Sequence, residues 1–72
     1  MCVVRITAEM TGTVFQVLVV VGQDVAAMQD VAILESMKME IPVQAPSKGT
    51  VAKLLVGPGD FVNEGDVLME LA

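Results

Sequence analysis

The sequence contains an internal repeat, and no other feature constrains its fold as strongly. Gly12–Val14 and Gly49–Val51 are the same Gly-Thr-Val triplet, and an apolar stretch follows each at the same spacing. Each half then has two Asp-apolar pairs, at Asp24-Val25, Asp30-Val31, Asp60-Phe61 and Asp66-Val67. The later matches are spaced one residue closer than the triplets, which predicts a slip of one residue near Val20-Val21.

Two copies of one half-unit predict a fold with approximate two-fold symmetry. Neither half contains enough strands to bury an apolar face by itself, so pairing the halves produces one shared core. We therefore expect residues 1–72 to form a single domain, because a chain of this length leaves no room for a second core.

The chain is predicted to be all-β. Valine dominates its apolar residues, and β-branched side chains favour strands. Glycine and proline separate the apolar runs at short, even intervals, which indicates a flattened antiparallel barrel or sandwich of six to eight strands. Short strands are expected at Val25-Ala26 and Phe61-Val62, and the main ones are Cys2–Ala8, Thr13–Val21, Val31–Ser36, Met39–Val43, Thr50–Val56 and Val67–Leu71. The strand that contains Pro42 should lie at a sheet edge or end near that residue, because proline cannot donate a ladder hydrogen bond.

Charge and composition argue against several classes of function. Nine acidic and four basic residues give a net charge of −5, which disfavours nucleic acid and anionic membranes as partners. Histidine is absent and Cys2 is the single cysteine, so we expect no zinc site, no internal disulfide and no histidine-dependent catalysis. A nucleophilic Cys2 would lack its usual base. The longest apolar run, Val17–Val21, is far shorter than the about 20 residues of a membrane-spanning helix. With no secretory signal visible, we expect a cytoplasmic protein.

One segment departs from plain strand-and-turn chemistry. Ile33–Ile41 has two apolar flanks around a polar centre, which predicts a hairpin with its turn at Met37-Lys38. A two-residue hairpin turn favours Gly, Asn or Asp, because both central residues take positive φ. The sequence has glycines near its other turns but none here, and local rules tend to fail at functional sites.

Lys38 is the candidate functional residue of this hairpin. It lies between the two half-repeats, so the symmetry predicts that it projects at the end of the molecule opposite the chain termini. Met37 and Met39 flank it with flexible, polarizable side chains that suit an adaptable contact surface. Glu35 and Glu40 keep the tip acidic. Lys48 and Lys53, in contrast, fit ordinary solvated surface positions.

The segment Glu35-Ser36-Met37-Lys38-Met39 resembles the biotin attachment motif of biotinyl domains, usually Glu-Ala-Met-Lys-Met. The likeness covers essentially the whole chain and is strongest to small stand-alone bacterial biotin/lipoyl attachment proteins. It implies a barrel-sandwich hybrid, a flattened barrel of two four-stranded antiparallel sheets with the modified lysine at a hairpin tip. It also implies that Lys38 is the biotinylation site and that Glu35, Ser36, Met37 and Met39 complete the attachment motif.

The resemblance further implies a carrier and not an enzyme. A biotin protein ligase would join biotin to the side-chain nitrogen of Lys38, and a biotin carboxylase would load a carboxyl group onto the cofactor. A carboxyltransferase would then pass that group to an acceptor. Tethering replaces diffusional capture with a high local concentration, and the cofactor supplies the chemistry.

The chain departs from the family pattern at two positions. Ser36 replaces the usual alanine, which is a change between small residues. Met28 stands where the family has glycine before Gln29, and a positive φ there would strain a methionine.

We also expect Gly49 to hold a left-handed turn conformation.

Two other functions remain as alternatives. A lipoyl carrier of a 2-oxoacid dehydrogenase or glycine-cleavage complex would share the fold, although lipoyl domains place Asp before the lysine and Ala after it. An unmodified β-module that acts only in protein interaction would carry no adduct on Lys38. The two are distinguished from the biotin carrier by what is found on Lys38.

Overall fold

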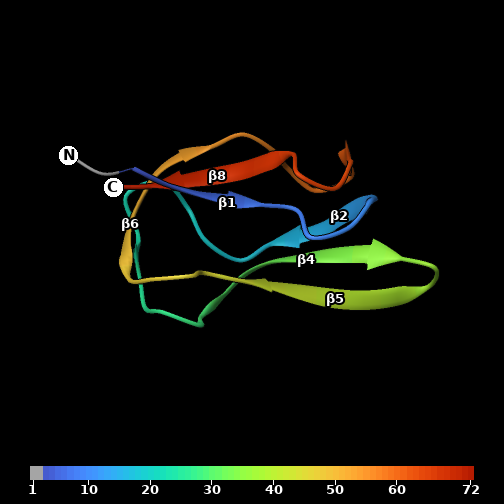
Figure 1. Ribbon diagram of the computed structural model, residues 1–72, viewed down its shortest axis with the longest axis horizontal. Coiled ribbons are helices and arrows are strands. Elements are labelled where there is room, and N and C mark those ends of the chain that lie inside the picture. Colours follow the sequence, from blue (N-terminus) through green and yellow to red (C-terminus); the bar gives the residue numbers. More distant parts are fainter. Residues whose placement is uncertain (1–2) are drawn as a thin grey trace.

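The structure, a computed structural model, describes residues 3–72 as two four-stranded antiparallel sheets (Figure 1). One sheet has the strand order β1-β8-β6-β3 and the other β5-β4-β2-β7. The predicted flattened barrel is therefore confirmed. The strands are β1 (Val4–Thr7), β2 (Gly12–Val17), β3 (Asp24–Val25), β4 (Asp30–Ser36), β5 (Met39–Gln44), β6 (Gly49–Leu54), β7 (Phe61–Val62) and β8 (Val67–Leu71).

The largest error in the predicted strands is the length of β2, which ends at Val17 and not at Val21. Val20–Gln23 form a turn, in which Gln23 N–H donates to the Val20 carbonyl (3.1 Å) and Gly22 has a φ of 94°. Hydrophobicity was a poor guide here because Val20 and Val21 face solvent. Similarly, the strand predicted over Thr50–Val56 ends at Leu54.

The other strand predictions need smaller changes. β1 is shorter than the predicted Cys2–Ala8, and Cys2 itself lies outside the described residues. The short strand expected at Val25-Ala26 is shifted by one residue to Asp24–Val25. β5 is an edge strand of its sheet, as the position of Pro42 predicted.

The two-fold repeat is more regular than the sequence indicated: residue n of the first half corresponds to residue n + 37 throughout. The predicted slip is wrong, because Asp60 corresponds to Gln23, not to Asp24. Val20 N–H donates to Gln23 Oε1 (3.2 Å), and Gly57 N–H donates to Asp60 Oδ2 (2.8 Å). Both turns thus need a side-chain oxygen as acceptor, which a glutamine and an aspartate supply equally well. Likewise, Gln29 corresponds to Asp66, and each accepts from a backbone N–H three residues earlier.

The core repeats in the same way. All fifteen buried apolar residues pair under the n + 37 rule, provided that the partly buried Val56 is taken as the partner of Val19. Side-chain size is not repeated everywhere, since Ala32 corresponds to Met69. The buried residues are Ile6, Ala8, Val14, Val19, Val25, Val31, Ala32, Leu34, Val43, Ala45, Val51, Val62, Leu68, Met69 and Leu71.

Gly49 has a role different from the one predicted. It has no positive φ and opens β6, where a Cβ would lie 3.1 Å from the Ala72 carbonyl oxygen. Its counterpart Gly12 is tighter, because a Cβ there would lie 2.6 Å from the Glu35 carbonyl oxygen. Both glycines therefore permit close approach of two strands.

Met28 does adopt the strained conformation that the sequence suggested. Its φ is 68°, and its counterpart Gly65 has a φ of 92°. Met28 N–H donates to the Ala45 carbonyl (2.8 Å) and Gly65 N–H donates to the Ala8 carbonyl (2.9 Å), so the two turns have the same bonding. The backbone geometry is thus fixed by the fold, and glycine fits it better than methionine.

Replacing Met28 with glycine should therefore stabilise the protein by about 1 kcal/mol, since a non-glycine residue in this region costs at least that much. The free energy of unfolding, measured with urea, tests the prediction. Met28→Ala is the matched control, because alanine retains the Cβ. Equal stabilities of the glycine and alanine variants would contradict the strain.

Gly12→Ala should destabilise the fold by about 2 kcal/mol, since an added methyl group overpacks the contact with Glu35. Gly49→Ala should cost less, because its neighbours are farther away. The ranking of the two unfolding free energies is the measurement. A larger loss at Gly49 would show that these distances do not control stability.

Candidate functional site: an exposed lysine hairpin

The β4–β5 hairpin holds the predicted attachment motif. The two strands pair as far as Ser36 and Met39, which leaves Met37-Lys38 as a two-residue turn. The φ values of Met37 and Lys38 are 52° and 65°, as a type I′ turn requires. Both residues are strained by the left-handed conformation, and the long antiparallel ladder behind them holds it. The predicted position and type of the turn are confirmed.

The β4–β5 turn, which contains Lys38, lies at one end of a molecule about 36 Å long (Figure 1). Ala72 and the start of β1 lie at the opposite end, as the symmetry predicted. The Lys38 side chain is exposed, and within residues 3–72 no ion pair or hydrogen bond engages its amine. Met37 and Met39 are 92% and 63% exposed. An enzyme could therefore reach the amine without moving any part of the fold.

Ser36 and Glu35 lie where β4 meets β2. A Cβ built on Gly12 would lie 3.4 Å from the Ser36 Cβ, so a side chain at position 12 would come into contact with Ser36. Glu35 is exposed and pairs directly with Glu40 across the hairpin. The contribution of Gly12 was missed by sequence reasoning, although its recurrence as Gly49 was a usable signal.

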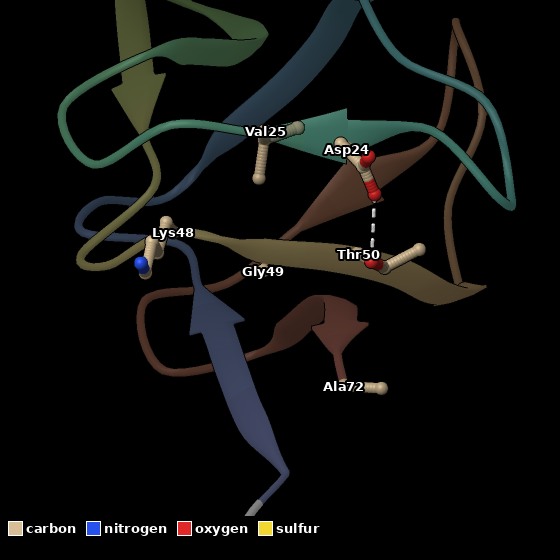
Figure 2. Close-up of a pocket in the computed structure, with 6 residues that line it drawn as sticks. All are labelled: Asp24, Val25, Lys48, Gly49, Thr50 and Ala72. Carbon is tan, nitrogen blue, oxygen red and sulfur yellow. Dashed lines mark hydrogen bonds between the residues drawn. The ribbon is translucent and has the colours of Figure 1, made fainter.

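The other two lysines are in different surroundings. Lys53 is the penultimate residue of β6, where it pairs with Glu70 of β8. Lys48 borders an open hollow of about 460 Å³ that is also lined by the C-terminal residue Ala72 (Figure 2). The C-terminus lies at the end of the molecule opposite the β4–β5 turn (Figure 1). Inside this hollow the Thr50 hydroxyl donates to Asp24 Oδ1 (2.8 Å). Neither lysine is on a hairpin turn.

Residues 3–72 contain no buried polar side chain and no group of three or more His, Cys, Asp or Glu arranged to hold a metal ion. The same residues include no helix that is long and apolar enough to cross a membrane. What the β4–β5 hairpin provides is an exposed amine at its turn.

Known proteins resemble this chain in sequence and in fold. A family profile described as "Biotin-requiring enzyme" matches residues 3–71. The chain is 49% identical to a biotin/lipoyl attachment protein of Bacillus subtilis, over 93% of this chain and 92% of that protein. It is 46% identical to a biotin carboxyl carrier protein of Streptococcus mutans, over 90% of this chain but only 50% of the relative.

Among solved structures, the urea carboxylase of Kluyveromyces lactis matches all of this chain with a TM-score of 0.93 and 33% identity. The chain covers only 6% of that enzyme. A single-chain, multi-domain long-chain acyl-CoA carboxylase matches 94% of the chain with a TM-score of 0.89. The profile match and these identities show that the chain belongs to the biotin/lipoyl attachment family of biotin-requiring enzymes.

Proposed function

We propose that Lys38 carries biotin in amide linkage and that the protein acts as a biotin carboxyl carrier. The observation that carries this proposal is the position of Lys38, an unpaired amine at the tip of a stiff hairpin. Family membership and the Glu35–Met39 motif support it. We likewise propose that residues 1–72 form one attachment domain.

The residues at the tip fit this cofactor. Amide formation would remove the charge of Lys38 and leave a flexible arm on a rigid base. Bound biotin would supply the group that accepts and releases the carboxyl. Glu35, Ser36, Met37 and Met39 would form the surface that enzymes meet around the arm. The protein would thus provide position and reach, and its partners the catalysis.

The relatives connect this chain to biotin-dependent carboxylases, which include a pyruvate carboxylase of Staphylococcus aureus. We propose three kinds of partner: a biotin protein ligase, a biotin carboxylase and a carboxyltransferase. All three would need access to Lys38, and the exposed hairpin provides it. We propose a cytoplasmic location for this exchange.

A lipoyl carrier is the second candidate, since one relative is named for both cofactors. Met37 and Met39 favour biotin over lipoate, because lipoyl domains place Asp and Ala at these positions. An unmodified interaction module is the third candidate. The mass of any adduct separates all three.

Co-expression with a biotin protein ligase and excess biotin should add one biotin per chain, detected by intact mass and mapped to Lys38 by peptide sequencing. Lys38→Arg should melt like the unsubstituted protein and remain unlabelled, because the lysine is exposed and makes no structural contact. Lys53→Arg is the matched control and should label normally. An adduct on Lys48 or Lys53, or lipoate on Lys38, would overturn the proposal.

A further inference from the structure

The two phenylalanines are the only aromatic residues of the sequence, and both are on the surface. Phe15 is 48% exposed and Phe61 is 66% exposed. Aromatic side chains bury more apolar area than any others and usually supply a small core. Here the core is entirely aliphatic, apart from methionine. The phenylalanines are therefore free to serve a surface function.

Both lie on the outer face of the sheet that carries Lys38. Phe61 in β7 pairs with Thr13 in β2, Thr13 pairs with Glu35, and Glu35 pairs with Glu40. Directly paired residues share a face, so these four form one row across the sheet. Phe15 follows Thr13 by two residues, at the bulge of β2. We call these five residues the Phe15–Phe61 face. The next pair along the hairpin after Glu35 and Glu40 is Ser36 and Met39, which flank the turn.

The two-fold repeat shows that the fold does not require aromatic residues here. The counterpart of Phe61 is Asp24, which pairs with Thr50 as Phe61 pairs with Thr13 (Figure 2). The counterpart of Phe15 is Ala52, at the same register shift in β6. Matched backbone positions thus accept a carboxylate and a methyl group. Stability alone does not explain two exposed phenylalanines.

The two ends of the molecule also differ in the charge of equivalent side chains. Glu35 and Glu40 face each other directly, and like charges at such positions are destabilising. Glu64 adds a third acid nearby, since its N–H donates to the hydroxyl of Thr11, just before β2 (3.3 Å). The counterparts of these three acids are uncharged side chains, Ala72, Val3 and Ala27. The hairpin end therefore combines exposed aromatic surface with three glutamates, here called the acidic border, whose counterparts have uncharged side chains.

We propose that the Phe15–Phe61 face is the docking surface for the ligase that acylates Lys38, an inference that rests on the function proposed above. The ligase would meet it with an apolar patch bordered by arginine or lysine, because the acidic border is complementary to cations. A lysine side chain is short, so its amine enters an active site only when the ligase covers the hairpin and the surface beside it. A stable interface covers about 800 Å² per partner, which is more than a two-residue turn presents.

The ligase depends on this face more than the carboxylating enzymes do. Once biotin is attached, the added arm extends the reach of Lys38, and an enzyme can receive the cofactor without covering the sheet. Exposed aromatic residues are typical anchors of protein interfaces. In this protein, ligase docking is the step that requires Phe15 and Phe61 as anchors.

Phe15→Ala with Phe61→Asn tests the proposal. These changes install the counterpart of Phe15 and an uncharged analogue of Asp24, and both sites are exposed, so the fold should be retained. Steady-state biotinylation, with the carrier protein varied, should show a KM for the carrier raised about tenfold and an unchanged kcat. Val21→Thr removes a similarly exposed apolar residue from the β2–β3 turn and should leave both constants unchanged.

Ionic strength tests the acidic border. Biotinylation of the unsubstituted protein should slow as salt rises, and Glu40→Gln should weaken this dependence. Circular dichroism melting of every variant checks the fold, and each single phenylalanine variant repeats the test should the double variant melt early. An unchanged KM, or a loss confined to kcat, would overturn the docking surface while leaving Lys38 as the attachment site. Failure to label the unsubstituted protein would overturn both proposals.

Discussion

The reciprocal exchange of strands between the two halves is the constraint on which this structure depends. Each sheet takes two strands from each half of the chain, so neither half has a sheet of its own. Two equivalent hydrogen bonds close the exchange: Gly22 N–H donates to the Val51 carbonyl (2.7 Å), and Gly59 N–H donates to the Val14 carbonyl (2.7 Å). With no disulfide and a core of aliphatic side chains, this interlocking is what gives a 72-residue chain a single rigid body.

The paired strands of the fold hold residues with strained backbone conformations at the tip of the β4–β5 hairpin. Among residues 3–72, three non-glycine residues have positive φ: Met28, Met37 and Lys38. Met28 occupies a position where its symmetry mate is glycine, so its strain follows from sequence and not from function. At Met37 and Lys38 the strain follows from the two-residue hairpin turn, whose central positions these residues occupy. The long β4–β5 ladder offsets the cost.

Sequence patterns predicted most of the architecture, because strands, turns and a repeat leave local signals. The hairpin, the edge position of β5 and the exposed Lys38 all followed from residues 33–41.

Errors arose where different residue types perform the same structural role. Gln23 and Asp60 serve the same turn, and this hid the true register of the repeat. Gly49 looked like a turn residue, yet it relieves a contact with the end of the chain that only three-dimensional structure reveals. The clustering of Phe15, Phe61, Glu35 and Glu40 was equally hidden, since it depends on pairing between strands distant in sequence.

The opposed positions of the hairpin and the chain ends have a mechanical consequence. In an n + 37 repeat, the turn after β4 is equivalent to the gap between the end of β8 and the start of β1. A polypeptide continued from either end would leave the molecule on the side away from Lys38. The domain would then behave as a stiff lever about 36 Å long, pivoting at its attachment to a larger assembly. The length of the domain would add to the reach of a cofactor carried at the hairpin tip. A small rotation at the point of attachment would then move the cofactor between catalytic centres that are far apart.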